Sequence, residues 1–120
     1  MTSHVVYNQI DPGFPASLSK KIITGLLRDQ MGFQGLVISD DLEMQAIKKK
    51  FTLPEAAIDA ADAGVDLIIA TGDTGKLLLD TLVAAVQSGR LSKTEVQKSY
   101  DRITKFKLAI VSNGGDGSGK

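Results

Sequence analysis

The chain has 120 residues, with 14 acidic and 14 basic side chains, one histidine and no cysteine. Its length suits one domain with a core of its own, and its balanced charge offers no single-sign field to attract nucleic acid or an anionic membrane. The lack of cysteine excludes disulfides, thiol catalysis and cysteine metal ligands, and a single histidine excludes a multi-histidine metal site within the chain. We expect a neutral partner, no metal and no cofactor.

Neither end of the sequence predicts a membrane segment. No apolar run approaches the roughly 18 residues that cross a bilayer, and the start, MTSHVVYNQ, lacks a basic region followed by a long apolar stretch. We therefore expect a soluble, unprocessed chain. The Gly- and Ser-rich end, with NGGDGSGK, predicts a flexible tail over residues 111–120 after a folded domain over residues 1–110.

Three short apolar stretches predict β-strands. The first, TSHVVY, is rich in β-branched residues, while GLVIS and VDLIIA are continuous apolar runs typical of parallel strands buried on both faces. Helical spacing and capping residues predict the helices between and after them: residues 20–31 behind an N-cap at Ser19, residues 44–49, a helix from Thr52 with a capping box to Glu55, residues 75–88, and a helix from Ser92 with a capping box to Glu95.

This alternation of strands and helices predicts an α/β fold, in which parallel strands are joined by right-handed crossovers. Active sites of such folds lie at the carboxyl ends of the strands. Three strands leave two hydrophobic edges open, and a complete eightfold barrel takes around 250 residues. We therefore expect a partial TIM-type barrel, roughly half of one, that belongs to a longer chain or pairs with another copy.

The stretch LVISDDLEM, residues 36–44, places acids directly after the second predicted strand. Asp40 and Asp41 are either solvated turn residues and helix caps, or one of them is a nucleophile or metal ligand. Adjacent residues of an extended chain point to opposite sides, so both cannot face one substrate without a bend. His4 also has two possible interpretations, as a buried histidine of a strand or as a catalytic histidine. Met44 is most simply a core residue.

These acids lie within LLRDQMGFQGLVISDDLEM, a segment that resembles the signature of glycoside hydrolase family 3. In that signature a helix and a Gly-Phe-x-Gly turn lead to an apolar strand, then to Ser or Thr and the catalytic Asp. The SDDLEM form resembles the bacterial β-N-acetylglucosaminidase branch. MTSHVVYNQIDPGFPASLSKKII and EAAIDAADAGVDLIIAT resemble neighbouring segments of the family, and the resemblance covers about residues 1 to 110.

The resemblance implies a retaining hydrolase that removes terminal GlcNAc from peptidoglycan-type glycosides. Asp40 would be the nucleophile that forms a covalent glycosyl-enzyme, and Asp41 would support the turn. His4 would line the sugar pocket, touching the substrate or orienting Asp40, and Met44 would border the N-acetyl group. The resemblance also implies a bacterial source with a cytoplasmic or cell-envelope location, and it leaves hydrolysis and phosphorolysis both open.

The family's general acid, a histidine on a mobile loop, has no matching segment in this sequence, and neither have its sugar-binding Lys-His pair and arginine. Retention needs such an acid beside the nucleophile. The chain thus resembles the C-terminal half of the catalytic barrel, and we expect it to be inactive alone, with the missing N-terminal half or a second copy as its partner. Two other functions stay open: a non-catalytic, self-associating half-barrel module, and a phosphoacceptor signalling domain with its acid at Asp73.

Overall fold

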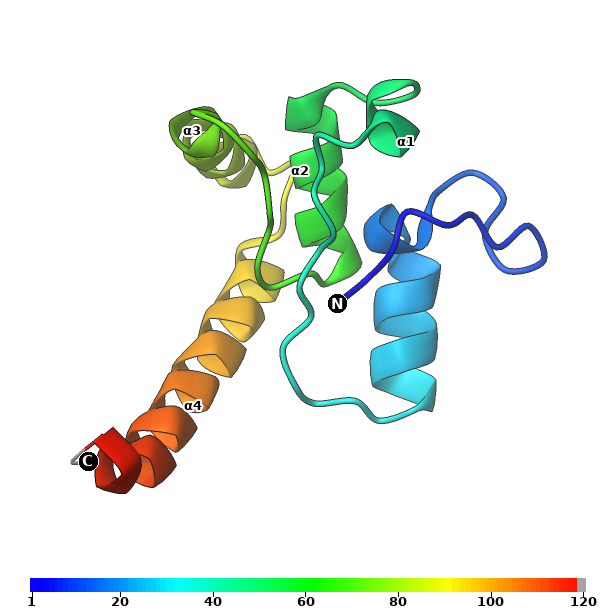
Figure 1. Cartoon of the computed structure of the whole chain (residues 1–120). Coiled ribbons are helices and arrows are strands. Elements are labelled where there is room, and N and C mark those ends of the chain that lie inside the picture. Colours follow the sequence, from blue (N-terminus) through cyan, green and yellow to red (C-terminus); the bar gives the residue numbers. More distant parts are fainter. Residues whose placement is uncertain (119–120) are drawn as a thin grey trace.

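The structure, a computed structural model, describes residues 1–118, and this part of the chain contains six helical elements joined by turns and loops (Figure 1). α2 lies between α3 and η2 and packs against both. α4 projects away from the rest of the molecule (Figure 1). The predicted flexible tail over residues 111–120 includes residues 119–120, which lie outside the described residues, and it stays a prediction. In chain order the elements are η1 (Ala16–Leu18), η2 (Lys21–Gln30), α1 (Gln45–Lys48), α2 (Leu53–Ala63), α3 (Gly75–Gln87) and α4 (Lys93–Ser118).

The predicted helices are confirmed, and local capping signals explain where two of them begin. The N–H of Ile22 donates to Oγ of Ser19 (3.2 Å), so Ser19 caps η2. Thr52 and Glu55 form the capping box of α2, because each side chain accepts the backbone N–H of the other residue. The sequence does not predict the winding of η2, which is a π-helix and has longer-range hydrogen bonds than an α-helix.

The predicted parallel sheet is wrong, and so is the fold class of half a TIM-type barrel, because residues 1–118 contain no strand. The three apolar segments lie side by side, but only one isolated bridge, between Ile38 and Leu67, joins two of them. Side chains interrupt the ladder: Oγ of Ser39 accepts the N–H of Ile69 (3.0 Å), and Oδ2 of Asp66 accepts the N–H of Val37 (3.0 Å). A regular ladder needs those N–H groups on carbonyls of the neighbouring segment, and three segments offer few neighbours to compensate.

The segment that leads to the acids is the middle one of the three. On one side, the N–H of Thr2 donates to the carbonyl oxygen of Ile38 (2.8 Å). On the other side, the N–H of Leu42 donates to the carbonyl oxygen of Ile69 (3.0 Å). The segment is therefore held against both neighbours, although the ladder is incomplete.

Small residues let α2 pack closely against its surroundings. At the end of α2, Gly64 has a φ of 112°, and a Cβ there would lie 2.8 Å from Oγ1 of Thr24 in η2. Only glycine suits this position, because both the backbone angle and the contact with η2 exclude a side chain. The face of α2 that meets the core is made of alanines with no exposed surface: Ala56, Ala57, Ala60 and Ala63. Larger buried side chains surround them: Leu18, Ile23, Val37, Leu42, Ile47, Val65 and Leu78.

One buried carboxylate, that of Asp66, joins three separate parts of the chain. Its Oδ2 accepts hydrogen bonds from Arg28 of η2 (2.7 Å) and from the N–H of Val37 (3.0 Å). Its Oδ1 accepts from Ser99 (2.6 Å) and Arg102 (2.9 Å) of α4. Burial lowers the pKa of the Arg28 guanidinium from its ordinary value; the Asp66 carboxylate opposes this shift, and the charge of Arg102 adds to it. Two guanidinium groups thus share one carboxylate in the interior.

We predict that Asp66→Ala lowers the free energy of unfolding by about 3–5 kcal/mol, because it leaves two largely buried guanidinium groups without their carboxylate. Asp80→Ala removes an exposed ion pair with Lys76 and is the matched control, with an expected loss below about 1 kcal/mol. Urea unfolding followed by circular dichroism measures both. Equal losses in the two variants would contradict the central role of Asp66.

Asp59 of α2 is a second charged group whose environment shifts its pKa. Burial raises the pKa of Asp59 above its ordinary value; Arg90, 3.3 Å away, opposes the shift, and Asp62 and Glu55 add to it. The folded state therefore binds this proton more tightly than the unfolded state does. Ionised Asp59 costs stability above the raised pKa, and the cost disappears as the pH falls through that pKa toward the ordinary value of about 3.9.

We predict that Asp59→Asn raises Tm, relative to the unchanged chain, more at pH 7 than at about pH 4. At pH 7 the substitution removes the cost of a buried charge, because the amide is neutral at either pH. Arg90→Gln should have the opposite effect at pH 7, since it leaves the carboxylate without its cation. Thermal unfolding of both variants and the unchanged chain at the two pH values is the measurement. A Tm change in Asp59→Asn that does not depend on pH would rule out this origin.

Candidate active site

The acids of LVISDDLEM sit in a turn that follows a buried segment. Val37 and Ser39 are buried, and Asp40 is half-buried where the segment ends. Oδ1 of Asp40 accepts the N–H of Asp41 (2.8 Å). Oδ2 of Asp40 accepts no hydrogen bond from the residues that the structure describes. One carboxylate oxygen is therefore fixed by the backbone, and the other can meet a bound molecule.

Asp41 is committed to the turn itself. Its Oδ1 accepts the N–H of Glu43 (2.9 Å), an arrangement in which a side chain stabilises the backbone two residues further on. Its backbone carbonyl oxygen accepts from Nε2 of His4 (2.7 Å). These are the contacts of a residue that supports the turn. Because Oδ1 of Asp41 already accepts a hydrogen bond, its carboxylate is a poor candidate for a second reacting group.

His4 uses both ring nitrogens on protein atoms. Nε2 contacts the carbonyl of Asp41, and Nδ1 lies 2.5 Å from Oγ of Ser17 in η1. Ser17 is fully buried. The imidazole therefore bridges η1 and the turn that carries Asp40, and its predicted contact with a sugar stays a prediction.

The turn is also tied to the loop before α3. Oε2 of Glu43 accepts the hydroxyl of Thr71 (2.9 Å) and that of Thr74 (3.4 Å). Asp73, between those threonines, is exposed. Sequence reasoning missed this role of Glu43 because its partner Thr71 lies 28 residues further along the chain and has no local signal.

Met44 is not the core residue that its apolar side chain suggests. It is 45% exposed, next to the acids at the start of α1. Its predicted place beside an N-acetyl group stays a prediction. Within residues 1–112, whose side chains the structure describes, no group of three or more acidic or histidine side chains is arranged to hold a metal ion.

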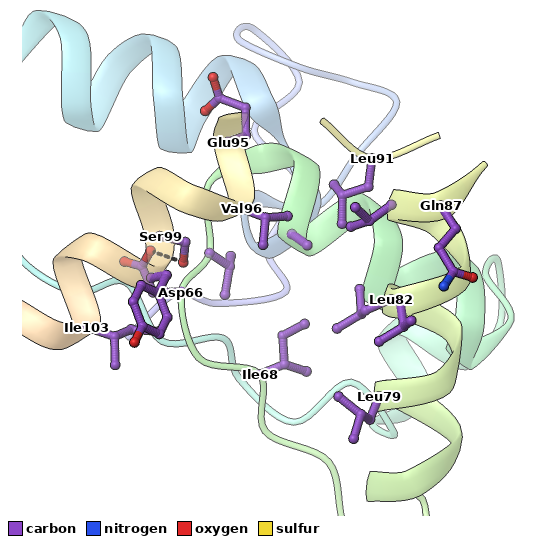
Figure 2. Close-up of a pocket in the computed structure, with 15 residues that line it drawn as sticks. Asp66, Ile68, Leu79, Leu82, Gln87, Leu91, Glu95, Val96, Ser99 and Ile103 are labelled. Carbon is purple, nitrogen blue, oxygen red and sulfur yellow. Dashed lines mark hydrogen bonds between the residues drawn. The ribbon is translucent and has the colours of Figure 1, made fainter. Parts of the chain in front are cut away.

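An apolar cavity of about 450 Å³ lies away from these acids, between α3 and α4 (Figure 2). Leu79 and Leu82 of α3 line one side, and Val96 and Ile103 of α4 line the other. The carboxylate of Asp66 borders it but is already bonded to two arginines. None of the acids after the second apolar segment lines this cavity, and neither does the histidine, so the cavity is separate from the candidate site.

Sequence reasoning also missed the polar residues that support the site. Ser17 and Ser39 are fully buried; the family signature includes Ser39, but nothing near either serine in the sequence marks its hydrogen-bond partner. Asp66 did carry a usable signal, because it is an acid inside the apolar run VDLIIA. A carboxylate buried in such a run must find a cation or several hydrogen-bond donors.

Comparison with known proteins gives matches along most of the chain. Residues 1–106 match the family model described as "Glycosyl hydrolase family 3 N terminal domain". The chain is 39% identical over 106 residues to an "Uncharacterized secreted glycosyl hydrolase" of Arthroderma benhamiae. This match covers 86% of this chain and 30% of that protein. It is 35% identical over 104 residues to a "Beta-hexosaminidase" of Nitrosomonas eutropha, and this match covers 82% of this chain and 30% of that protein. The solved structure of the β-N-acetylglucosaminidase from Thermotoga maritima has a TM-score of 0.81 at 40% identity, over 88% of this chain and 24% of that one.

The chain belongs to glycosyl hydrolase family 3, in the branch with these β-hexosaminidases and β-N-acetylglucosaminidases. This confirms the resemblance carried by SDDLEM and its neighbours, and it sets aside the phosphoacceptor domain. The chain spans less than a third of the length of these relatives. Among the helices that the structure describes, none combines the length and the apolar character needed to cross a membrane.

Proposed function

We propose that this chain supplies the nucleophile-bearing part of a retaining β-N-acetylglucosaminidase, with Asp40 as the nucleophile. The observation that supports this most directly is the asymmetric carboxylate of Asp40. One oxygen is held by the N–H of Asp41, and the other has no partner within the described part of the chain. The segment before Asp40 is buried and bonded on both sides, which is the rigid support that a reacting group needs.

The proposed reaction consists of two displacements at the anomeric carbon of GlcNAc. Oδ2 of Asp40 attacks that carbon while the glycosidic bond breaks, and the leaving oxygen takes a proton from a general acid. Water then attacks the same anomeric carbon, its proton passes to the conjugate base of that acid, and the bond from the anomeric carbon to Asp40 breaks to release the carboxylate. Two inversions give net retention. The bond from the N–H of Asp41 to Oδ1 limits rotation of the carboxylate and leaves Oδ2 for the reaction.

The general acid of this reaction is proposed to lie beyond this chain. A retaining site places its second group about 5–5.5 Å from the nucleophile. The neighbouring carboxylates of Asp41 and Glu43 both accept hydrogen bonds from protein groups, and both nitrogens of His4 are bonded. We therefore infer that the isolated chain is inactive or nearly so, and that the rest of the family's catalytic domain, or a second copy, completes the site.

The proposed substrate class is terminal GlcNAc on peptidoglycan-type glycosides. Relatives named as a β-hexosaminidase and a β-N-acetylglucosaminidase support the sugar. Met44 supports it as well, because an exposed, polarisable side chain beside the acids suits contact with an acetyl methyl group. A bacterial cytoplasmic or cell-envelope location belongs to the same proposal.

The nucleophile assignment predicts that Asp40→Asn abolishes hydrolysis. We expect this chain, mixed with or fused to the N-terminal part of the Thermotoga maritima β-N-acetylglucosaminidase, to release nitrophenol from para-nitrophenyl GlcNAc. A neutral amide cannot form the glycosyl ester, so Asp40→Asn should lower kcat/KM by at least about a thousandfold.

Asp41→Asn is the matched control for this variant, since its amide oxygen can still accept the N–H of Glu43. Its activity should stay within about tenfold of that of the unchanged chain, the size expected when one hydrogen bond weakens. Hydrolysis that is equal before and after Asp40→Asn, or losses that are equal in both variants, would contradict the assignment.

A non-catalytic, self-associating module is the second candidate function, and exposed apolar side chains favour it. Leu79 of α3 is 62% exposed, and Tyr100 and Leu108 of α4 are 63% and 65% exposed. Exposed apolar surface of this kind is typical of contacts between chains. Self-association is compatible with the first function, because it could also bring two incomplete sites together.

Self-association predicts a dimer or larger species in sedimentation velocity, with a fraction that rises with protein concentration. Leu79→Lys and Leu108→Lys should shift the chain toward the monomer, because they place a charge in the contact. Thr94→Lys, on an exposed polar part of α4, controls for the added charge. A chain that sediments as a monomer at every concentration would exclude this function.

A further inference from the structure

His4 connects the turn of the proposed nucleophile to a buried hydroxyl. Its Nε2 lies 2.7 Å from the carbonyl oxygen of Asp41, and its Nδ1 lies 2.5 Å from Oγ of Ser17. A carbonyl oxygen can only accept a hydrogen bond, so Nε2 must carry a hydrogen. The contact with Asp41 thus determines that Nε2 is the donor nitrogen of the ring.

The contact with Ser17 determines the protonation of the other ring nitrogen, Nδ1. The side chain of Ser17 has no exposed surface, and Nδ1 of His4 is the acceptor that its hydroxyl meets within the described part of the chain. A buried hydroxyl hydrogen without an acceptor costs free energy, so the hydroxyl donates to Nδ1 and that nitrogen carries no hydrogen. The ring is then neutral, with its single N–H at Nε2.

The peptide unit that His4 contacts is held at both of its ends. Its carbonyl, from Asp41, accepts from His4, and its N–H, from Leu42, donates to the carbonyl of Ile69 (3.0 Å). The next peptide unit toward the N-terminus supplies the N–H that holds Oδ1 of Asp40 (2.8 Å). Because neighbouring peptide planes share the Cα of Asp41, fixing one plane restricts the other.

We propose that His4, as the neutral Nε2–H tautomer clamped between Ser17 and the carbonyl of Asp41, is a positioning residue that orients the carboxylate of Asp40. This inference rests on the proposed role of Asp40 as the nucleophile. Both nitrogens are occupied by protein atoms, so the ring keeps neither a donor nor a lone pair for a sugar hydroxyl. Its proposed role is therefore to hold the reacting group, without a hydrogen bond from its ring nitrogens to the substrate.

The tautomer gives a direct test, because the sequence contains one histidine and hence one set of ring signals. Long-range ¹H–¹⁵N correlation spectra of the 120-residue chain at about pH 8, where a histidine ring in water is mostly neutral, report the nitrogen that carries the hydrogen. We expect a protonated Nε2 and an unprotonated Nδ1. A hydrogen on Nδ1, or averaged signals from two exchanging tautomers, would overturn the proposal.

The positioning effect is tested with His4→Phe, which keeps a ring but removes both hydrogen bonds, and with Ser17→Ala, which removes only the bond to Nδ1. In His4→Phe we expect the ¹³Cγ signal of Asp40 to move, and the amides of Asp41 and Glu43 to exchange about tenfold faster relative to the amides of α2. Ser17→Ala should have smaller effects in the same direction.

Thr24→Val, in η2, is the matched control, because it also removes a partly buried side-chain bond to a backbone carbonyl, the 2.7 Å bond to Ala63. It should leave the ¹³Cγ signal of Asp40 and the relative exchange at Asp41 unchanged. If His4→Phe does not fold, Ser17→Ala carries the same comparison. Unchanged signals at Asp40 and Asp41 in the folded variants would refute positioning by His4. None of these readouts needs hydrolysis, so failure of the nucleophile assignment would be seen separately.

Discussion

The buried carboxylate of Asp66 is the interaction on which the arrangement of this chain depends. It bonds Arg28 of η2 and Arg102 of α4 and also accepts the N–H of Val37, so one side chain connects two helices to the middle apolar segment. The bonds involve charged groups in the interior, where they are strong when complete and costly when one partner is lost. Because only one isolated bridge, between Ile38 and Leu67, joins two of the apolar segments, the bonds of Asp66 are a major link between the helices and the middle segment.

The same constraint reaches the proposed nucleophile. Val37 lies three residues before Asp40 on a buried segment, so the start of that segment is anchored by Asp66. Its far end is anchored by His4 on the carbonyl of Asp41 and by Glu43 through Thr71. The carboxylate that the proposed chemistry requires is thus supported by three side chains, while its Oδ2 accepts no hydrogen bond within residues 1–112. A preorganised group of this kind loses little entropy when the substrate arrives.

The helices follow from signals that lie within a few residues of each other. Ser19 caps η2, and Thr52 with Glu55 caps α2, because each cap needs only its own turn of helix. The sheet failed as a prediction for the opposite reason. Apolar runs such as GLVIS do favour burial, and Val37 is buried, but a ladder depends on which atoms of a distant segment face each N–H. Here Ser39 and Asp66 supply those acceptors from their side chains.

The sequence by itself determined the family, the helices and the acid pair, because those depend on residue types at short and regular spacing. Only the tertiary structure decided how the two acids differ: Asp41 is bonded to Glu43 and His4, while Oδ2 of Asp40 accepts no hydrogen bond from the residues whose side chains are described. It also decided that both nitrogens of His4 are used, through Ser17, 13 residues away, and Asp41, 37 residues away. Contacts at such separations follow from the folded path of the chain, which local patterns do not encode.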